Sequence, residues 1–151
     1  MGTELVEGVY YQPLNVINTT GGSVMHAIKG FDENFSEFGE CYFSTAQSNS
    51  PKAWKKHSKM ICNLFVPIGN VRFVFYDDRA ASKDNGKIVE FTLGLHNYGR
   101  LIINPGIWFG FAAVSEGSDS LIMNLCNIAH HPDESIRLEP GAIEIPYTWT
   151  F

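Results

Sequence analysis

The residues best suited to chemistry lie between Lys52 and Lys59, in the segment Lys-Ala-Trp-Lys-Lys-His-Ser-Lys. This segment holds four of the eleven Lys and Arg residues and one of the five histidines, on a chain whose formal net charge is -5. Positive charge concentrated in one place on an acidic protein indicates a site for a small anion, because nucleic-acid-binding proteins usually carry basic charge over a whole face. A solvated lysine-rich turn with a surface histidine is the competing interpretation.

His57 is the candidate general base of this segment. A neutral imidazole suits proton abstraction because its unperturbed pKa of about 6.5 lies near the working pH. A carboxylate on the other ring nitrogen would hold the imidazole in one tautomer, and the candidates are Glu139, Asp77 and Asp78. We expect the neighbouring lysines to oppose protonation of His57 and so to keep it available as a base.

A second group must return the proton that a base removes. Tyrosine hydroxyls are the candidates, and the sequence alone does not choose among Tyr42, Tyr76, Tyr98 and Tyr147. Each of them is otherwise an ordinary aromatic residue of a strand. We carry Tyr42 forward as the candidate acid.

The elements that must position these residues are short strands. The chain of 151 residues is 44% apolar but only 18% charged, which favours a compact β protein or a buried dimer interface. No segment shows an apolar period of about 3.6 residues over three turns, whereas turn signals recur roughly every eight to twelve residues. These features predict one all-β domain over residues 1–151, built as a sandwich or small barrel.

Three local predictions bear on the site. The apolar run from Met60 to Ile68 predicts a buried strand that anchors the basic segment, and Gly69-Asn70 predicts a hairpin with the strand after it. Pro13 predicts that residues 9–17 form an edge strand or arm. The three prolines after His130 predict an irregular tail.

The cysteines indicate a reducing compartment. Cys41, Cys62 and Cys126 are odd in number, widely spaced and set in apolar runs, which is typical of reduced core residues of a cytoplasmic protein. The N-terminus has no secretory signal, and no apolar run approaches the ~20 residues of a membrane helix. We therefore expect a cytoplasmic protein that binds neither membrane nor nucleic acid.

Four patterns, in a shared order, resemble the dTDP-4-dehydrorhamnose 3,5-epimerases, a family of the cupin superfamily. Members show Arg-Gly-Leu-His, a Gly-x-Val strand ending in Asp-x-Arg, Pro-Gly-x-x-His-Gly-Phe, and an acidic-Pro segment followed by Ile and Pro. The matching segments here are Trp54-Lys-Lys-His57, Gly69-Asn-Val71 through Asp77-Asp-Arg79, Pro105-Gly-Ile-Trp-Phe-Gly-Phe111, and Glu139-Pro-Gly-Ala-Ile-Glu-Ile-Pro146. The resemblance spans roughly residues 39 to 146 and implies an all-β, cupin-type jelly-roll β-barrel.

The resemblance also implies roles for particular residues. His57 falls on the family's base, and Glu139 lies near the acidic residue that pairs with it. The family's Arg, its later His and its Tyr strand correspond here to Trp54, Phe109 and residues 121–128, which contain no Tyr. The residues expected to contact a nucleotide diphosphate or to stack on a base or sugar are Trp54, Lys55, Lys56, Lys59, Arg79 and Trp108.

A metal site is the alternative chemistry for a cupin-like barrel. It typically needs a His-x-His pair with later Glu and His ligands, but here Lys59 and Phe109 stand at two of those places. The adjacent His130 and His131 point apart more often than together. We therefore expect no metal and no cofactor, although a metal-dependent cupin stays an alternative.

The resulting hypothesis is an epimerase or isomerase of cell-surface polysaccharide synthesis. It would act on a nucleotide-linked 4-keto-6-deoxy sugar by metal-free proton abstraction, with His57 as base and Asp77 or Glu139 as its orienting acid. The resemblance also implies a homodimer. The alternative from a different class is a non-catalytic module that binds a nucleotide sugar or a carbohydrate through the lysines.

Overall fold

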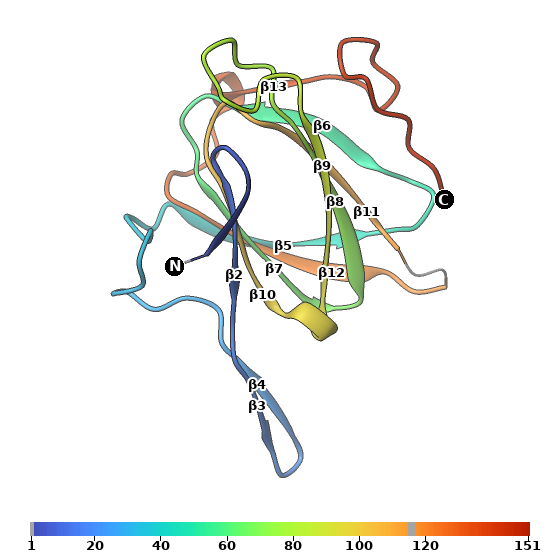
Figure 1. Cartoon of the computed structure of the whole chain (residues 1–151). Helices are drawn as coiled ribbons and strands as arrows, with labels where there is room; N and C mark the ends of the chain where they lie inside the picture. Colours follow the sequence, from blue (N-terminus) through green and yellow to red (C-terminus); the bar gives the residue numbers. More distant parts are fainter. Residues whose placement is uncertain (1, 115–116) are drawn as a thin grey trace.

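Two antiparallel sheets packed face to face form the computed structural model, which describes residues 2–114 and 117–151 (Figure 1). Within these residues the first sheet has the order β1 (Thr3–Val6), β2 (Val9–Pro13), β10 (Gly99–Ile103), β7 (Cys62–Ile68), β12 (Ser120–Cys126) and β5 (Glu40–Ala46). The second sheet has the order β13 (Ser135–Arg137), β6 (Lys52–His57), β11 (Trp108–Ala113), β8 (Asn70–Tyr76) and β9 (Ile88–Gly94). A separate hairpin joins β3 (Val16–Thr19) to β4 (Gly22–Met25), and the two 3-10 turns are η1 (Leu95–Asn97) and η2 (Pro132–Glu134).

The predicted all-β jelly roll is confirmed. Side chains alternate across the strands, so that one face of each sheet contributes to a shared apolar core. In β12, for example, Ser120, Ile122, Asn124 and Cys126 are buried while the residues between them are half-buried. This alternation places Asn124 and Cys126 on the inner face of the first sheet, where they reach the site described below.

The predicted hairpin at Gly69 is wrong. β7 pairs with β10 and β12 in the first sheet, whereas β8 pairs with β11 and β9 in the second. Gly69, with φ of 84°, instead lets the chain cross from one sheet to the other, and a Cβ at this position would lie 2.1 Å from Ser120 Oγ. A tight turn is compatible with both arrangements, because only non-local pairing decides which strand each segment joins.

The N-terminal segment also differs from the prediction. β2 is an interior strand, paired with β1 on one side and β10 on the other, and Pro13 stands at its last position opposite Gly99. The chain then leaves the barrel as the β3–β4 hairpin, which projects away from the two sheets (Figure 1). The tail is less irregular than expected, because β13 pairs with β6 at the edge of the second sheet.

Across the residues that the structure describes, no helix is both long and apolar enough to span a membrane.

Candidate active site

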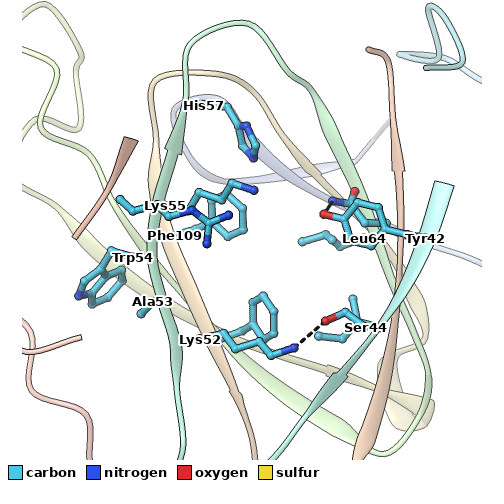
Figure 2. Close-up of a pocket in the computed structure, with 13 residues that line it drawn as sticks. Tyr42, Ser44, Lys52, Ala53, Trp54, Lys55, His57, Leu64 and Phe109 are labelled. Atoms are coloured by element: carbon cyan, nitrogen blue, oxygen red, sulfur yellow. Dashed lines mark hydrogen bonds between the residues drawn. The ribbon is translucent and has the colours of Figure 1, made fainter. Parts of the chain in front are cut away.

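A cavity of about 440 Å³ lies between the sheets, bordered by β5 and β12 on one side and β6 on the other (Figure 2). One wall carries the cationic and basic side chains of Lys52, Lys55, His57 and Arg137. The opposite wall carries the polar side chains of Tyr42, Ser44 and Asn124. The cavity therefore combines a candidate base, candidate acids and positive charge.

His57 stands at the end of β6 with only 4% of its surface exposed. Its Nδ1 lies 2.6 Å from Glu134 Oε2, and its ring stacks on Phe109 with centroids 6.0 Å apart. The other carboxylate oxygen, Glu134 Oε1, accepts hydrogen bonds from the backbone amides of Lys59 (2.9 Å) and Met60 (2.8 Å). This arrangement fixes the Nδ1–H tautomer and leaves Nε2 as the basic nitrogen.

The prediction that Glu139 or Asp77 orients His57 is wrong, because Glu134 occupies that place. Glu139 is exposed on the tail. Glu134 belongs to η2, in the stretch whose prolines predicted an irregular tail, and it is 77 residues from His57 in the chain. No local sequence pattern indicates that this turn lies beside the end of β6.

Protonation equilibria of the pair are strongly shifted. Burial raises the pKa of Glu134, but the hydrogen bonds from His57 and from the two backbone amides outweigh burial and bring the pKa to about 2. Burial lowers the pKa of His57, but contacts with Cys62 and Glu134 outweigh it and the net shift is upward. The expectation that lysines keep His57 neutral is therefore wrong: Lys55 does lower this pKa, but more weakly.

A pair of thiols lies beneath the imidazole. Cys62 on β7 and Cys126 on β12 are directly opposite each other in the register, and both are fully buried. The Cys126 contact and then the His57 contact lower the pKa of Cys62, while the contact with Cys62 raises the pKa of Cys126. The predicted burial of these two cysteines is confirmed, but Cys41 is exposed.

The cationic wall depends on an irregularity of β6. Lys52 and Lys55 are three residues apart, so strict alternation would put them on opposite faces, but the β6–β11 register shifts between their partners Phe111 and Phe109. Lys52 Nζ reaches across the cavity to Ser44 Oγ at 2.9 Å, and the Lys55 side chain extends into the cavity (Figure 2). Arg137 stands opposite Lys55 in the β13–β6 register. Burial first, and then the charge of Arg137, lower the pKa of Lys55. Lys52 and Arg137 were not in the predicted binding set, although Lys52 lies in the basic segment.

Lys56, Trp108 and Trp54 were expected to bind substrate, but their side chains have other partners. Lys56 Nζ lies 2.9 Å from Asp78 Oδ2 and 4.8 Å from the centre of the Trp108 ring, and Trp108 Nε1 donates to the same carboxylate oxygen at 2.9 Å. Trp54 borders the cavity, but its indole turns away from it (Figure 2) and donates to the Pro140 carbonyl at 3.1 Å. The structure thus does not bring these three side chains to His57.

Three further predicted residues, Arg79, Asp77 and Lys59, lie outside the cavity. Arg79 donates from Nε and from Nη2 to Asp77, each at 2.8 Å, and this contact is the main reason why the pKa of Asp77 is about 2. Arg79 Nη2 also donates to the Glu7 carbonyl at 2.6 Å, so the pair braces a loop against the N-terminal strands. Lys59 contributes its backbone amide to Glu134, but its side chain is exposed.

Of the four candidate tyrosines, Tyr42 is the one that lines the cavity. It stands on β5 directly opposite Asn124 of β12, and Asn124 Nδ2 donates to its hydroxyl oxygen at 2.9 Å. Burial raises the pKa of Tyr42, and the Asn124 amide opposes that rise. Within residues 2–114 and 117–151, no group of three His, Cys, Asp or Glu side chains is placed to hold a metal ion.

The fold and the site together define a cupin-type jelly-roll barrel with a His–carboxylate pair in its cavity. The fold matches the crystal structure of a dTDP sugar isomerase from Desulfovibrio desulfuricans G20 with a TM-score of 0.92. The two sequences are 39% identical, and the match covers 95% of this chain and 92% of that chain. The chain therefore belongs to the family of this dTDP sugar isomerase, and its fold is that of the dTDP-4-dehydrorhamnose 3,5-epimerase-like cupins that the sequence resembles.

Two further proteins extend this comparison. The spore coat polysaccharide biosynthesis protein SpsL of Bacillus subtilis (strain 168) is 27% identical over 131 residues, which are 86% of this chain and 85% of that protein. ChmJ, a 3'-monoepimerase from Streptomyces bikiniensis crystallised with dTDP-quinovose, has a TM-score of 0.85 at 14% identity, with 99% of this chain and 78% of that chain covered. At that identity the likeness to ChmJ concerns the fold. No model of a protein family matches the sequence.

Proposed function

We propose that the protein is an epimerase or isomerase that acts on a nucleotide-linked 4-keto-6-deoxy sugar, with His57 as the general base. The proposal is supported by the similarity of this chain, at 39% identity, to a dTDP sugar isomerase. The observation that carries it is the buried His57–Glu134 pair, whose Nδ1–Oε2 distance is 2.6 Å, on the wall of a cavity that Tyr42 enters from the other side.

Proton abstraction next to a ketone needs a base, stabilisation of the enolate oxygen and a returning acid. The carboxylate of Glu134 holds the Nδ1 proton, so Nε2 can accept a proton from the sugar and the resulting imidazolium is stabilised by Glu134. The raised pKa of His57 makes it a stronger base but also places part of it in the protonated form near neutral pH. Activity should therefore rise with pH as the pKa of His57 is passed.

The positive wall suits the diphosphate of a nucleotide sugar. Lys52, Lys55 and Arg137 come from β6 and β13 and converge on one cavity, where apolar walls strengthen their attraction for an anion. Lys56 and Lys59 lie outside this cavity, so we assign the contact to the three cavity residues. Tyr42 is the candidate acid, on the wall across from His57.

The test is solvent exchange at the sugar. The protein is incubated with dTDP-4-keto-6-deoxyglucose in heavy water, and proton NMR follows the C–H signals next to the ketone. We expect loss of one signal with the natural protein, and no loss with His57→Asn, which should still bind dTDP. Binding of dTDP and of the sugar nucleotide without any exchange would refute the enzymatic proposal and support a non-catalytic nucleotide-sugar module.

We also propose that the chain acts as a homodimer in polysaccharide biosynthesis, the process named for the similar spore coat protein. A two-stranded hairpin is marginally stable alone, yet β3–β4 exposes Val16, Ile17 and Val24. Phe43 of β5 is also 66% exposed. Sedimentation of the natural protein as a dimer, and of Phe43→Glu as a monomer, would support this assignment; a monomeric natural protein would refute it. The cytoplasmic location stays a prediction.

A further inference from the structure

Asn124 is a buried polar residue of the cavity whose hydrogen-bonding capacity is incompletely used. Only 4% of its surface is exposed, and its Oδ1 has no hydrogen-bond partner among the residues that the structure describes. A buried amide oxygen without a partner is destabilising and uncommon in folded proteins. Because Asn124 lines the cavity, a ligand can supply the missing donor.

The other half of the amide determines how Tyr42 can act. Asn124 Nδ2 donates to the Tyr42 hydroxyl oxygen at 2.9 Å, so this oxygen is the acceptor and its own proton is directed elsewhere. In the described part of the chain no second partner of the Tyr42 hydroxyl is found. The wall opposite His57 thus presents an O–H donor next to a C=O acceptor.

We propose that Tyr42 and Asn124 together recognise a ketone and the hydroxyl on the adjacent carbon, so that the enzyme reacts at C3 of the sugar. This inference rests on the proposed function. In a 4-keto-6-deoxyhexose both C3 and C5 adjoin the ketone, but only C3 carries a hydroxyl, whereas C5 carries the methyl group and the ring oxygen. Tyr42 donates to the C4 oxygen, and Asn124 Oδ1 accepts from the C3 hydroxyl.

The step at C3 uses His57 and Tyr42, and solvent resets their protonation states. The C3–H bond breaks and its proton moves to Nε2 of His57, while the electron pair forms the C3=C4 bond. The former carbonyl pair moves to the C4 oxygen, which the Tyr42 O–H stabilises. As the electron pair returns from the C4 oxygen, C3 takes a proton again. A proton from His57 Nε2 restores the original configuration, whereas a proton from the Tyr42 O–H on the opposite face inverts C3, and solvent then reprotonates Tyr42 and takes the proton from His57. Asn124 is a positioning residue throughout, since it orients the Tyr42 hydroxyl and the C3 hydroxyl.

Asn63 supplies a matched control. It is also a buried asparagine whose Oδ1 has no partner among the described residues, and its Nδ2 donates to the Leu125 carbonyl at 3.0 Å. It stands on β7 between Cys62 and Leu64, so its side chain points to the other face of the first sheet, and it does not line the cavity. Substitution of Asn63 removes a comparable amide without touching the proposed recognition.

The first test uses binding alone. Calorimetry compares dTDP-6-deoxyglucose with dTDP-3,6-dideoxyglucose, which lacks the C3 hydroxyl. The natural protein and Asn63→Leu should favour the first ligand by roughly 10- to 100-fold, the range for one buried hydrogen bond, and Asn124→Leu by less than about 3-fold. Asn124→Ala adds no bulk and replaces the Leu variant if that variant does not fold. A preference that survives in both Asn124 variants, or is absent from the natural protein, overturns the inference.

The second test locates the exchanged carbon. With dTDP-4-keto-6-deoxyglucose in heavy water, deuterium should enter C3 and not C5. Deuterium at C5, alone or together with C3, overturns this inference but leaves the proposed function intact, whereas absence of exchange overturns the proposed function and leaves the binding preference to decide. The pKa of Tyr42 gives an independent readout of positioning. It is measured from tyrosinate absorbance, as the difference between a protein with Tyr42 and the matching Tyr42→Phe variant. Tyr42 should titrate at higher pH in Asn124→Leu than in the natural protein, because the amide donor lowers the pKa of Tyr42. An unchanged titration would contradict the positioning role.

Discussion

Replacing Glu134 with Gln should move the proton on His57 while it leaves the shape of the site nearly unchanged. The Gln carbonyl can still accept from the backbone amides of Lys59 and Met60, which lie 2.9 and 2.8 Å from Glu134 Oε1. Its NH2 group then replaces Oε2 and faces His57 Nδ1 as a donor. Nδ1 becomes the acceptor, the ring proton moves to Nε2, and the nitrogen needed as base is blocked.

The expected loss of activity is large. The same kind of change in the Ser-His-Asp triad, an established example from another enzyme, lowers kcat about 10⁴-fold by selecting the wrong tautomer. We expect C–H exchange to fall roughly 10³- to 10⁴-fold, which corresponds to about 4–5.5 kcal/mol of transition-state stabilisation. Affinity for dTDP should stay within about 3-fold of that of the natural protein, because Glu134 does not line the cavity and so does not contact the nucleotide there.

The same substitution should change the response of stability to pH. A pKa that falls from 4.5 in the unfolded chain to about 2 in the fold corresponds to roughly 3 kcal/mol. This contribution is present above pH 4.5 and is lost as the pH falls toward about 2. The pKa of His57 is raised by Cys62 first and by Glu134 second, so Glu134→Gln removes only part of this effect. The contribution of the raised pKa is complete below about pH 6.5 and declines as the pH rises through the folded value.

Three measurements check this prediction: the exchange rate, urea unfolding at about pH 3 and 7, and the nitrogen chemical shifts of His57, which distinguish the two tautomers. Glu139→Gln is the matched control, since Glu139 is an exposed residue of the same tail and should change none of them. The reasoning is refuted if Glu134→Gln exchanges within about 3-fold of the natural protein, or if its His57 keeps the proton on Nδ1.

Two further predictions concern the cavity walls. Tyr42→Phe should slow proton return by about 10²- to 10⁴-fold while dTDP binding persists, and the measurement is product formation against dTDP affinity. Lys55→Met should weaken dTDP binding, with a smaller effect at high salt, whereas Lys56→Met, on the side chain bonded to Asp78, should not; calorimetry at two salt concentrations checks both. Equal losses from the two lysine variants would contradict the assignment of the cationic wall.

Much of the fold follows from local sequence because its signals are local. Alternation and closely spaced turns are enough to predict a barrel of short strands, and the ordered motifs narrow the barrel to a jelly roll. The errors concern pairing. Gly69 turns a corner between the sheets rather than closing a hairpin, and residues 135–137 find a partner in β6 that lies about 80 residues earlier in the chain. No property of either segment alone specifies such a partner.

Only part of the site was predicted, because one element was misread. Residues 52–59 were treated as one cluster of charge, but residues 52–57 form a strand, and a strand has two faces. Lys55 and His57 therefore face the cavity, while Lys56 between them bonds to Asp78 outside it. Alternation was available in the sequence and would have separated Lys55 from Lys56, but it would also have put Lys52 on the face of Lys56. The register shift that brings Lys52 back to the cavity was not available. The role of Glu134 was not available, because the turn that carries it meets His57 only in the folded chain.

The position of Tyr42 leads to one more prediction. Residues 121–128, which the resemblance aligns with the family's Tyr strand, contain no Tyr, but Tyr42 lies directly across from Asn124 of that strand. Directly opposed residues of antiparallel strands are about 4.5–5.5 Å apart at Cα, so a tyrosine on either strand can bring its hydroxyl to the same wall. Tyr42→Asn should lose C–H exchange. The reciprocal double variant, Tyr42→Asn with Asn124→Tyr, should exchange at least about 10-fold faster than Tyr42→Asn alone. Heavy-water NMR measures C–H exchange in both variants. A reciprocal variant that folds but is no more active than Tyr42→Asn would contradict this prediction. Tyr42 would then act through its place on β5 and not through the position of its hydroxyl alone.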